Sequence, residues 1–365
     1  MPKSLVSLGL TVIFLLLSPT GAFGQTIELS ETIRVDPAAK FKATPRSFCI
    51  TEDNLFLLLD NQSATINLFE KKGNSLKFIK AIGPRFGEEE FVQPFYCFYS
   101  QDEGKLGVID YGARKVFIFD RRGKVYYELI KSIDCPRLGY DMEFSGDGEQ
   151  VVISGYIIDK SNTFDLYSRH IRTGQISYLL PSHQKYNLKT NNDFLIEFKK
   201  KQRLPAIGIK AYIDILPNGD DLFFVWEGAL RVIKINLRSK GTTVFGYKSS
   251  NSTKANEADE FKLADSYAKG DYETTLKERK KRAYARNIFA TSRHVFLVYE
   301  TAKGNQSRAS KFRMQIYSLD GKYEGDTIIP GTPGRQMWFD KENYELYAFS
   351  EKEIVIFKYK ININK

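Results

Sequence analysis

The sequence is poor in the residues that build disulfide and metal centres, with three cysteines and three histidines in 365 residues. Three cysteines are too few, and odd in number, for a disulfide framework. Cys49 and Cys97 each lie in an apolar, strand-like stretch, which favours buried free thiols, while a bridge between these two is left open. The histidines are far apart and lack the spacing of zinc ligands. The composition therefore excludes a fold held together mainly by disulfides and does not predict a zinc site.

Sequence signatures of catalysis are also missing. The chain has no GxSxG element, no glycine-rich phosphate loop and no Cys and His pairing that would support a nucleophile. Spacing along the chain does not exclude a site assembled from distant strands. An enzyme is therefore the alternative interpretation rather than the first one.

Only one long apolar run occurs, and it lies at the N-terminus. A cation precedes it, and it gives way to small and turn residues, with Ala22 and Gly24 before a predicted cleavage at Gln25. This pattern is typical of a secretory signal peptide, predicted over residues 1–24 and followed by one domain over residues 25–365. A retained signal anchor is the alternative. No later segment reaches the ~20 apolar residues of a membrane span, and no cysteine stands near for lipid attachment. We expect an exported protein, periplasmic or secreted, without an integral membrane segment after cleavage.

Acidic residues are outnumbered, since 54 Lys and Arg against 44 Asp and Glu give a formal net charge of +10. A basic surface attracts polyanions such as nucleic acid, anionic lipid and acidic polysaccharide. Export makes nucleic acid the least fitting of these, so we expect no nucleic-acid partner and consider a protein or an anionic saccharide. The alternative is that the charge only keeps the protein soluble.

Aromatic residues are abundant, with 27 Phe and 21 Tyr in short runs separated by Gly, Asp and Asn. Such runs predict many short strands. Two of them share one plan, because Asp60 precedes Phe69 by nine residues and Asp110 precedes Phe119 by nine. Each copy is expected to be the middle hairpin of a four-stranded sheet.

The pattern continues to the C-terminus and predicts six such units. The last unit lacks a fourth strand, and residues 26–35 are strand-like without a partner of their own. We therefore expect an all-β fold, a six-bladed β-propeller of four-stranded antiparallel blades, in which the N-terminal strand completes the last blade and removes an open edge. A pair of β-sandwiches is the alternative. The predicted blades span residues 45–82, 94–133, 138–180, 211–246, 286–330 and 335–360 plus 26–35, with insertions at 181–210 and 247–285.

The second unit also resembles a known repeat. Residues 82–125 are similar to the NHL repeat, in which Gly, Phe and Pro precede a VxD strand, an Arg and a strand that ends in Phe-Asp before a Gly. The matching positions are Gly87, Phe91, Pro94, Asp110, Arg114, Phe119, Asp120 and Gly123. The whole chain resembles the divergent six-bladed propellers exported by Bacteroidota-type bacteria. Some similar propellers are lactonases, lyases or glycan-cleaving enzymes that use a divalent cation, so the resemblance allows binding or catalysis.

One face of the expected ring is predicted to bind a ligand. The loop that leads into the innermost strand and the loop between the second and third strands open on the same face. Cations stand before five predicted inner strands, at Arg46, Arg137, Lys210, Arg286 and Arg335. Arginine guanidinium groups bind carboxylates and sulfates through paired hydrogen bonds. The aromatic rings of Tyr111, Trp226 and Trp338 would add surfaces on which a ligand stacks. We predict that these eight residues bind the ligand; the alternative is ion pairing between blades and ordinary packing.

Acids end the predicted second strands at Asp60, Asp110, Glu227 and Glu300. Their oxygens would hold calcium, or act as acid and base, if the protein is a metal-assisted propeller enzyme. The alternative role is turn capping. The sequence favours an exported, non-catalytic binding scaffold, monomeric and without a cofactor, so calcium and these four ligands belong only to the alternative.

Overall fold

The computed structural model describes residues 25–36, 41–42, 44–101, 103–135, 139–159, 162–181, 210–216, 219–227, 230–246, 271, 273–274, 283–301 and 311–363. The predicted signal peptide, most of both predicted insertions and Arg137 lie outside these residues. The described residues form 26 strands, and none of their helices is long and apolar enough to cross a membrane.

Four sheets contain four antiparallel strands each, with neighbours in chain order. The first consists of β8 (Pro94–Ser100), β9 (Lys105–Asp110), β10 (Lys115–Arg121) and β11 (Tyr127–Asp134). The second consists of β12 (Gly139–Phe144), β13 (Gln150–Asp159), β14 (Asn162–His170) and β15 (Ile176–Pro181). The third consists of β16 (Ala211–Ile215), β17 (Asp221–Trp226), β18 (Val232–Asn236) and β19 (Thr242–Phe245). The fourth consists of β20 (Tyr284–Ala290), β21 (His294–Glu300), β22 (Phe312–Ser318) and β23 (Tyr323–Ile328).

An eight-stranded sheet joins the two ends of the described chain, in the order β2-β3-β4-β5-β1-β26-β25-β24. Its strands are β1 (Thr26–Val35), β2 (Ser47–Ile50), β3 (Leu55–Asp60), β4 (Thr65–Lys72), β5 (Ser75–Ile82), β24 (Gln336–Asp340), β25 (Glu345–Ser350) and β26 (Val355–Asn362). β1 pairs antiparallel with β26 over most of its length. It also pairs in parallel with β5, through Arg34 with Ser75 and Val35 with Leu76. A small ribbon of β6 (Arg85–Phe86) and β7 (Glu89–Glu90) follows β5.

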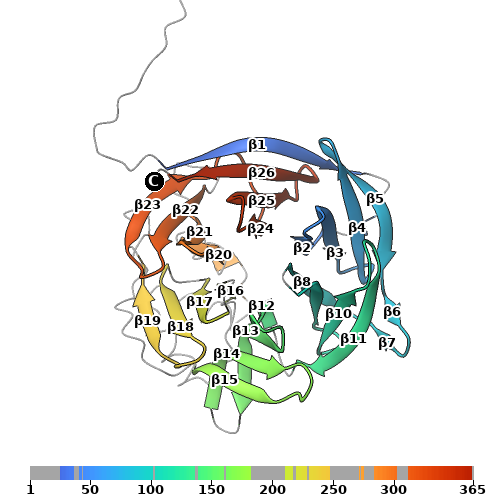
Figure 1. Ribbon diagram of the computed structural model, residues 1–365. Helices are drawn as coiled ribbons and strands as arrows, with labels where there is room; N and C mark the ends of the chain where they lie inside the picture. Colours follow the sequence, from blue (N-terminus) through green and yellow to red (C-terminus); the bar gives the residue numbers. More distant parts are fainter. Residues whose placement is uncertain are drawn as a thin grey trace, which may run out of the picture.

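The sheets stand around a common centre, as Figure 1 shows. Strands β2, β8, β12, β16, β20 and β24 surround this centre, and β1 lies along β26 at the rim although the two come from opposite ends of the chain. Four-stranded antiparallel sheets arranged radially around a central channel are the architecture of a β-propeller. The predicted all-β class and the repetition of four-stranded sheets are confirmed.

The core lies between neighbouring sheets. Leu57 of β3 and Val108 and Phe117 of the next sheet belong to one buried cluster. Every residue of β3 is buried, because a strand inside the ring is covered on both faces, whereas the outer strand β5 mixes buried and exposed positions. Fully burying one such apolar side chain contributes ~1.5–3 kcal/mol relative to exposure, so packing between sheets is the main source of stability.

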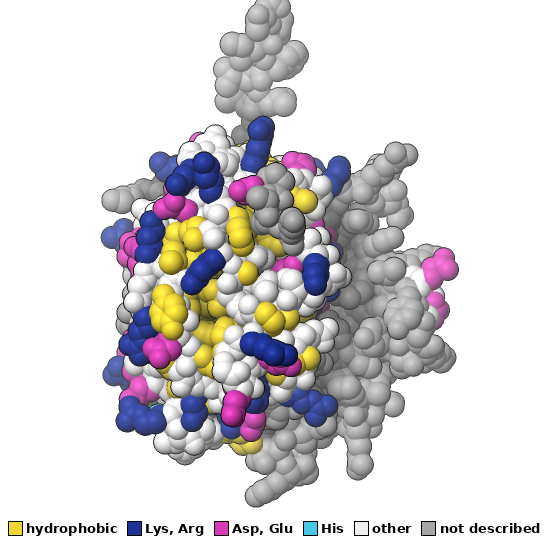
Figure 2. All heavy atoms as spheres, turned by 90° about the vertical axis from the view of Figure 1, so that its right-hand side faces the viewer, with side chains coloured by type: hydrophobic (Ala, Val, Ile, Leu, Met, Phe, Trp, Pro, Cys, Tyr) yellow, Lys and Arg dark blue, Asp and Glu magenta, His cyan; other side chains and the backbone are white. Residues whose placement is uncertain are grey.

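The outer wall over β5 and β11 carries apolar side chains among cations. Figure 2 looks at this side of the ring, where hydrophobic side chains gather in the middle and Lys and Arg lie around them. Phe78 and Ile79 of β5 and Ile130 of β11 are among the exposed large apolar residues. The Lys80 ammonium lies 5.7 Å from the centre of the Tyr126 ring. Cationic side chains therefore lie around the apolar residues of this outer wall.

Candidate functional site

A cavity of about 180 Å³ lies at the centre of the ring, and residues of β2, β8, β12, β16, β20 and β24 line it. It lies toward the end of the channel where the inner strands finish. Ser100, Ser145 and Lys341, at or just after the ends of β8, β12 and β24, form part of its wall. An apolar cavity of ~150 Å³ can hold benzene, so this space suits a small organic molecule.

Three inner strands each use a polar side chain to hold the next inner strand. Asp141 Oδ2 on β12 accepts a hydrogen bond from the N–H of Ile213 on β16 (2.9 Å). Asp214 Oδ2 on β16 accepts one from the N–H of Ala290 on β20 (2.6 Å). The Asn287 amide on β20 donates to a backbone carbonyl of β24 (3.4 Å). Because the inner edge of a sheet leaves backbone groups without a strand partner, these side chains satisfy that edge and fix neighbouring sheets together.

Asp214 also forms the ion pair of the cavity. Lys341 Nζ lies 2.6 Å from Asp214 Oδ1 and donates to the Ile215 carbonyl (3.0 Å). Burial raises the pKa of Asp214, and the attraction of Lys341 opposes that rise without cancelling it. Burial also raises the pKa of Asp141 to about 7, against the opposing hydrogen bond of Tyr96 and two backbone N–H groups. The acids of the cavity are therefore not all charged at neutral pH.

Glu143 is a buried carboxyl of the cavity that forms no hydrogen bond with the residues that the structure describes. Its exposed fraction is 8%, it lines the cavity, and no described residue forms a hydrogen bond with it. Burial raises the pKa of Glu143 well above its ordinary value, the negative charge of Asp214 adds to this rise, and Lys341 opposes it. Glu143 therefore holds its proton to higher pH than an ordinary glutamate does, on the wall of the cavity.

Asp141, Glu143, Asp214 and Lys341 were not among the predicted site residues, although the sequence around the three acids contains part of the pattern that would indicate them. In YDMEF (140–144) Asp141 and Glu143 alternate with apolar residues, and in AYIDIL (211–216) Asp214 lies within an apolar run. An acid inside a buried inner strand has to face the centre of the ring, because the packed space between sheets gives it no water. Lys341 gives no such signal, since its partner lies 127 residues away in the chain.

Arg286, predicted to precede an inner strand, instead lies inside β20, which begins at Tyr284. Its buried guanidinium donates from Nε to Glu300 Oε2 (2.8 Å) and from Nη1 to Glu227 Oε1. Arg335 Nη2 lies 3.3 Å from the same Glu300 oxygen, while most of its side chain is exposed. These cations and acids form one ion cluster across three sheets, which is the alternative role that the sequence left open.

Lys210 and Tyr111 are brought together by Phe95. The Tyr111 and Phe95 rings stack with centroids 4.3 Å apart, and Lys210 Nζ lies 5.8 Å from the centre of the Phe95 ring. The Tyr111 hydroxyl donates to the Gly139 carbonyl at the start of β12 (2.5 Å). Arg46 is exposed just before β2. Lys210, Tyr111 and Arg46 lie outside the lining of the central cavity.

The two tryptophans have different surroundings. Trp226 is buried, donates from Nε1 to Asp165 (3.2 Å) and packs edge-on against Phe224. Trp338 is partly buried, lines the cavity and packs edge-on against Tyr347. Of the seven predicted ligand-binding residues that the structure describes, Trp338 lines the cavity.

Asp60 and Asp110, the repeated aspartates, hold equivalent turns. The Asp110 carboxylate accepts hydrogen bonds from the N–H groups of Val92 (2.8 Å), Gln93 (2.9 Å) and Ala113 (2.9 Å). Asp60 likewise bonds to the segment before β2 and to the turn after β3. Each therefore ties a hairpin turn to the loop that leads into an inner strand. Within the described ranges, no group of three or more His, Cys, Asp or Glu side chains is arranged to hold a metal ion.

The fold and its central cavity place the chain among the β-propellers. No family model and no curated protein matches the sequence. A solved structure of a DUF4221-family member from Bacteroides vulgatus is similar, with a TM-score of 0.63 and 13% identity over 93% of this chain and 99% of that one. A Bacteroides fragilis protein thought to be exported is similar as well, with a TM-score of 0.58 and 13% identity over 93% of this chain and 96% of that one. At such identity the similarity shows the fold alone.

Proposed function

We propose that this protein is an exported β-propeller that binds a small ligand in its central channel, with Glu143 as the main anchoring group. The observation that carries this proposal is the Glu143 carboxyl, which is buried, faces the cavity and receives no hydrogen bond from a described residue. The Glu143 carboxyl remains accessible from the cavity. A hydroxyl or amino group of a ligand can therefore hydrogen-bond to this carboxyl in place of water.

The chemistry of the wall favours a neutral or cationic ligand that carries hydroxyl or amino groups. Five acidic residues, Glu103, Asp141, Glu143, Asp214 and Glu342, line the cavity with the single ammonium of Lys341. A carboxylate or sulfate on the ligand would be repelled as these acids ionise. Trp338 offers an apolar face of the kind on which sugar rings pack. A polyol, a neutral sugar or an amino sugar fits these groups better than an anionic saccharide.

The predicted site at the loops that lead into the inner strands remains a second place for an anionic ligand or a protein partner. Arg46 and Arg335 are two of its exposed cations, and Lys210 is exposed as well. Reversal of both charges, in Arg46→Glu with Arg335→Glu, would abolish binding there and leave binding in the cavity unchanged.

We also infer that the ring has six blades, because the eight-stranded sheet divides into β2–β5 and β24–β26 with β1. The long antiparallel pairing of β1 with β26, against two residue pairs with β5, supports this division. The equivalent turns of Asp60 and Asp110 support the NHL-like interpretation of the hairpins. Export is supported by the N-terminal apolar run and by the similar Bacteroides fragilis protein. Removal of residues 25–35 should then lower the melting temperature strongly, and an unchanged melting temperature would contradict closure by β1.

Catalysis is the second candidate function, and the raised pKa of the buried Glu143 carboxyl favours it. A carboxyl with a raised pKa beside a second acid is the arrangement that general acid and base chemistry uses. Turnover of a sugar lactone or glycan, lost in Glu143→Gln and insensitive to chelators, would support this candidate. Turnover that calcium restores after chelation would instead support the metal-assisted alternative through Asp60, Asp110, Glu227 and Glu300.

The test of the binding proposal is a ligand screen by thermal shift, since a ligand that binds the native state raises the melting temperature. The probes are polyols, neutral sugars, amino sugars and uronic acids. Glu143→Gln and Trp338→Ala should each lose the shift, whereas Glu353→Gln, at an exposed turn position, should keep it. A shift that both cavity variants retain would overturn the proposed site.

A further inference from the structure

Two cysteines face each other where the first inner strand meets the second. Cys49 lies in β2 and Cys97 in β8, and their Sγ atoms are 3.9 Å apart. Each side chain has an exposed fraction of 1%, and both residues form part of the cavity wall. Cys49, Cys97 and Cys135 are all buried, and the structure has no disulfide bond between them.

The backbones on either side of this sulfur pair are held in register. The Ser47 hydroxyl donates to the Cys97 carbonyl (3.2 Å) and accepts from the Cys97 N–H (3.3 Å). The strands β2 and β8 are therefore fixed side by side at the level of the thiols. Bonded sulfurs are ~2.0 Å apart, so each Sγ has to move by only about 1 Å, a distance that small side-chain rotations supply.

We propose that Cys49 and Cys97 form a disulfide in the exported protein, which covalently links the β2–β5 strands to the neighbouring sheet. An exported chain meets an oxidising compartment, where such bonds form and persist. In this respect the inference rests on the proposed export. Cys135 stays reduced, because its sulfur lies against the Tyr167 hydroxyl (3.3 Å) at a different contact between sheets.

The reaction is thiol–disulfide exchange with a disulfide-containing oxidant, such as oxidised glutathione or an oxidoreductase. One Cys thiolate attacks a sulfur of the oxidant, which forms a mixed disulfide and releases the first thiol of the oxidant. The second Cys thiolate then attacks the protein sulfur of the mixed disulfide, which forms the Cys49–Cys97 bond and releases the second thiol. The two protein thiols lose two protons and two electrons, and the oxidant leaves as two thiols. Burial raises the pKa of Cys49, so the thiolate is scarce in the folded state and oxidation proceeds mainly while the chain folds.

The bond closes a chain loop of 48 residues in sequence separation. Closing a loop of this length with a covalent bond lowers the entropy of the unfolded chain. For a domain of this size, that loss corresponds to a melting temperature about 5 °C higher. The link also prevents the two sheets from separating beside the cavity, so the ligand wall keeps its shape.

The test is refolding of residues 25–365 in a glutathione redox buffer, followed by alkylation under denaturing conditions and intact mass measurement. Oxidising buffer should leave one alkylated cysteine, Cys135, and reducing buffer should leave three. Peptide mapping should find Cys49 joined to Cys97. Three alkylated cysteines after oxidation, or a bond that contains Cys135, would overturn the proposal.

Variants separate the bond from a general effect of losing a buried thiol. Cys135→Ser should keep the difference in melting temperature between oxidised and reduced protein, and Cys49→Ser or Cys97→Ser should lose it. Where a serine variant fails to fold, the peptide map of the unmodified chain still decides. Refolding in vitro does not depend on secretion. If the bond forms in vitro but protein recovered from cells has reduced Cys49 and Cys97, the proposed export is wrong, while the two cysteines are still shown to be able to form the bond.

Discussion

Replacement of Asp141 by asparagine should flatten the pH dependence of stability between pH 4 and pH 8. The carboxyl is almost fully buried and its pKa is raised to about 7 from an ordinary 3.8, mainly by burial. The folded protein therefore binds this proton more tightly than the unfolded chain does. Stability is highest below the unfolded pKa and falls as the pH rises toward the folded pKa, which is the reverse of an ordinary salt-bridged aspartate.

The size of the change in unfolding free energy follows from the pKa shift of Asp141. Each pKa unit corresponds to ~1.4 kcal/mol, so a rise of about three units removes up to ~4 kcal/mol of unfolding free energy across this pH range. Asparagine does not titrate, and its one carbonyl oxygen replaces two carboxylate oxygens that accept from Met142 and Ile213. One backbone N–H then loses its partner, at a cost of ~1–3 kcal/mol that does not vary with pH. Asp141→Asn should be less stable than the unchanged protein at pH 4 and should approach or exceed it at pH 8.

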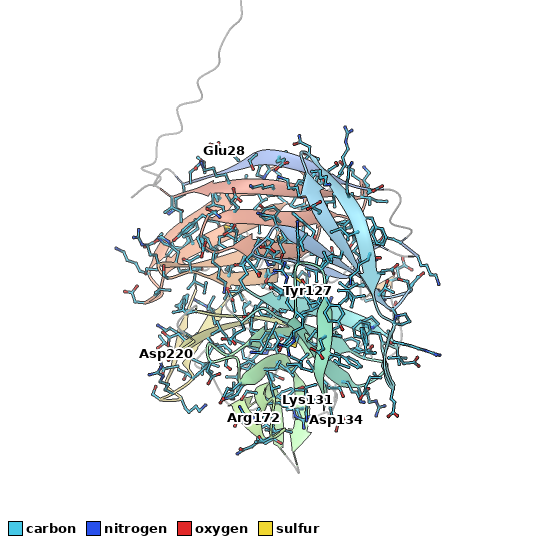
Figure 3. The ribbon with its side chains drawn as sticks, turned by 45° about the vertical axis from the view of Figure 1, so that its right-hand side comes forward. Glu28, Tyr127, Lys131, Asp134, Arg172 and Asp220 are labelled. Carbon is cyan, nitrogen blue, oxygen red and sulfur yellow. The ribbon has the colours of Figure 1, made fainter. Side chains whose placement is uncertain are left out.

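The assay is urea denaturation at several pH values, with unfolding free energies compared at each pH. Asp134→Asn is the matched control, because Asp134 is exposed at the end of β11 on the outside of the ring (Figure 3). The unfolding free energy of the control should vary with pH in the same way as that of the unchanged protein. If the unfolding free energy of Asp141→Asn also varies with pH as that of the unchanged protein does, Asp141 is not the titrating group and the assignment of the raised pKa is wrong.

Three further substitutions test the contacts between sheets by the same denaturation method. Arg286→Met leaves the acids Glu227 and Glu300 without their main partner and should cost ~3–5 kcal/mol at pH 7; a loss below ~1 kcal/mol would refute a structural role for the ion cluster. Asp110→Ala removes the acceptor of three backbone N–H groups and should cost ~2–3 kcal/mol, more than Asp110→Asn, and equal costs would contradict the turn-capping role. Lys341→Met removes the partner of the raised-pKa acid in β16, so its destabilisation should grow with pH, and a loss that stays constant from pH 5 to pH 8 would contradict the pairing.

The repeat could be predicted from the sequence because it depends on local patterns. Asp60 and Asp110 mark equivalent hairpins, and the structure gives both the same turn and loop contacts. The apolar runs between them form strands buried on both faces. A short-range signal of this kind survives in a single sequence, since strand and turn preferences act within a few residues.

The site was much less predictable, because it depends on which residues meet across the ring. Arg286 was expected to stand before an inner strand, but β20 begins two residues earlier, and the shift buries the guanidinium among acids. Lys341 meets Asp214 only through the closure of several sheets. Glu143 looks ordinary until the inner strand β12 is seen to face a cavity. Contacts between distant segments leave no local pattern in the residues that make them.

The most direct test of ligand binding in the channel is a titration of the best compound from the thermal-shift screen into the unchanged protein and into Glu143→Gln, measured by calorimetry at the same pH. We expect saturable binding to the unchanged protein and at least tenfold weaker binding to Glu143→Gln, whereas Arg46→Glu should bind the compound as tightly as the unchanged protein does. Equal affinity of Glu143→Gln, together with loss of binding in Arg46→Glu, would contradict the channel site and return the ligand to the loops that lead into the inner strands.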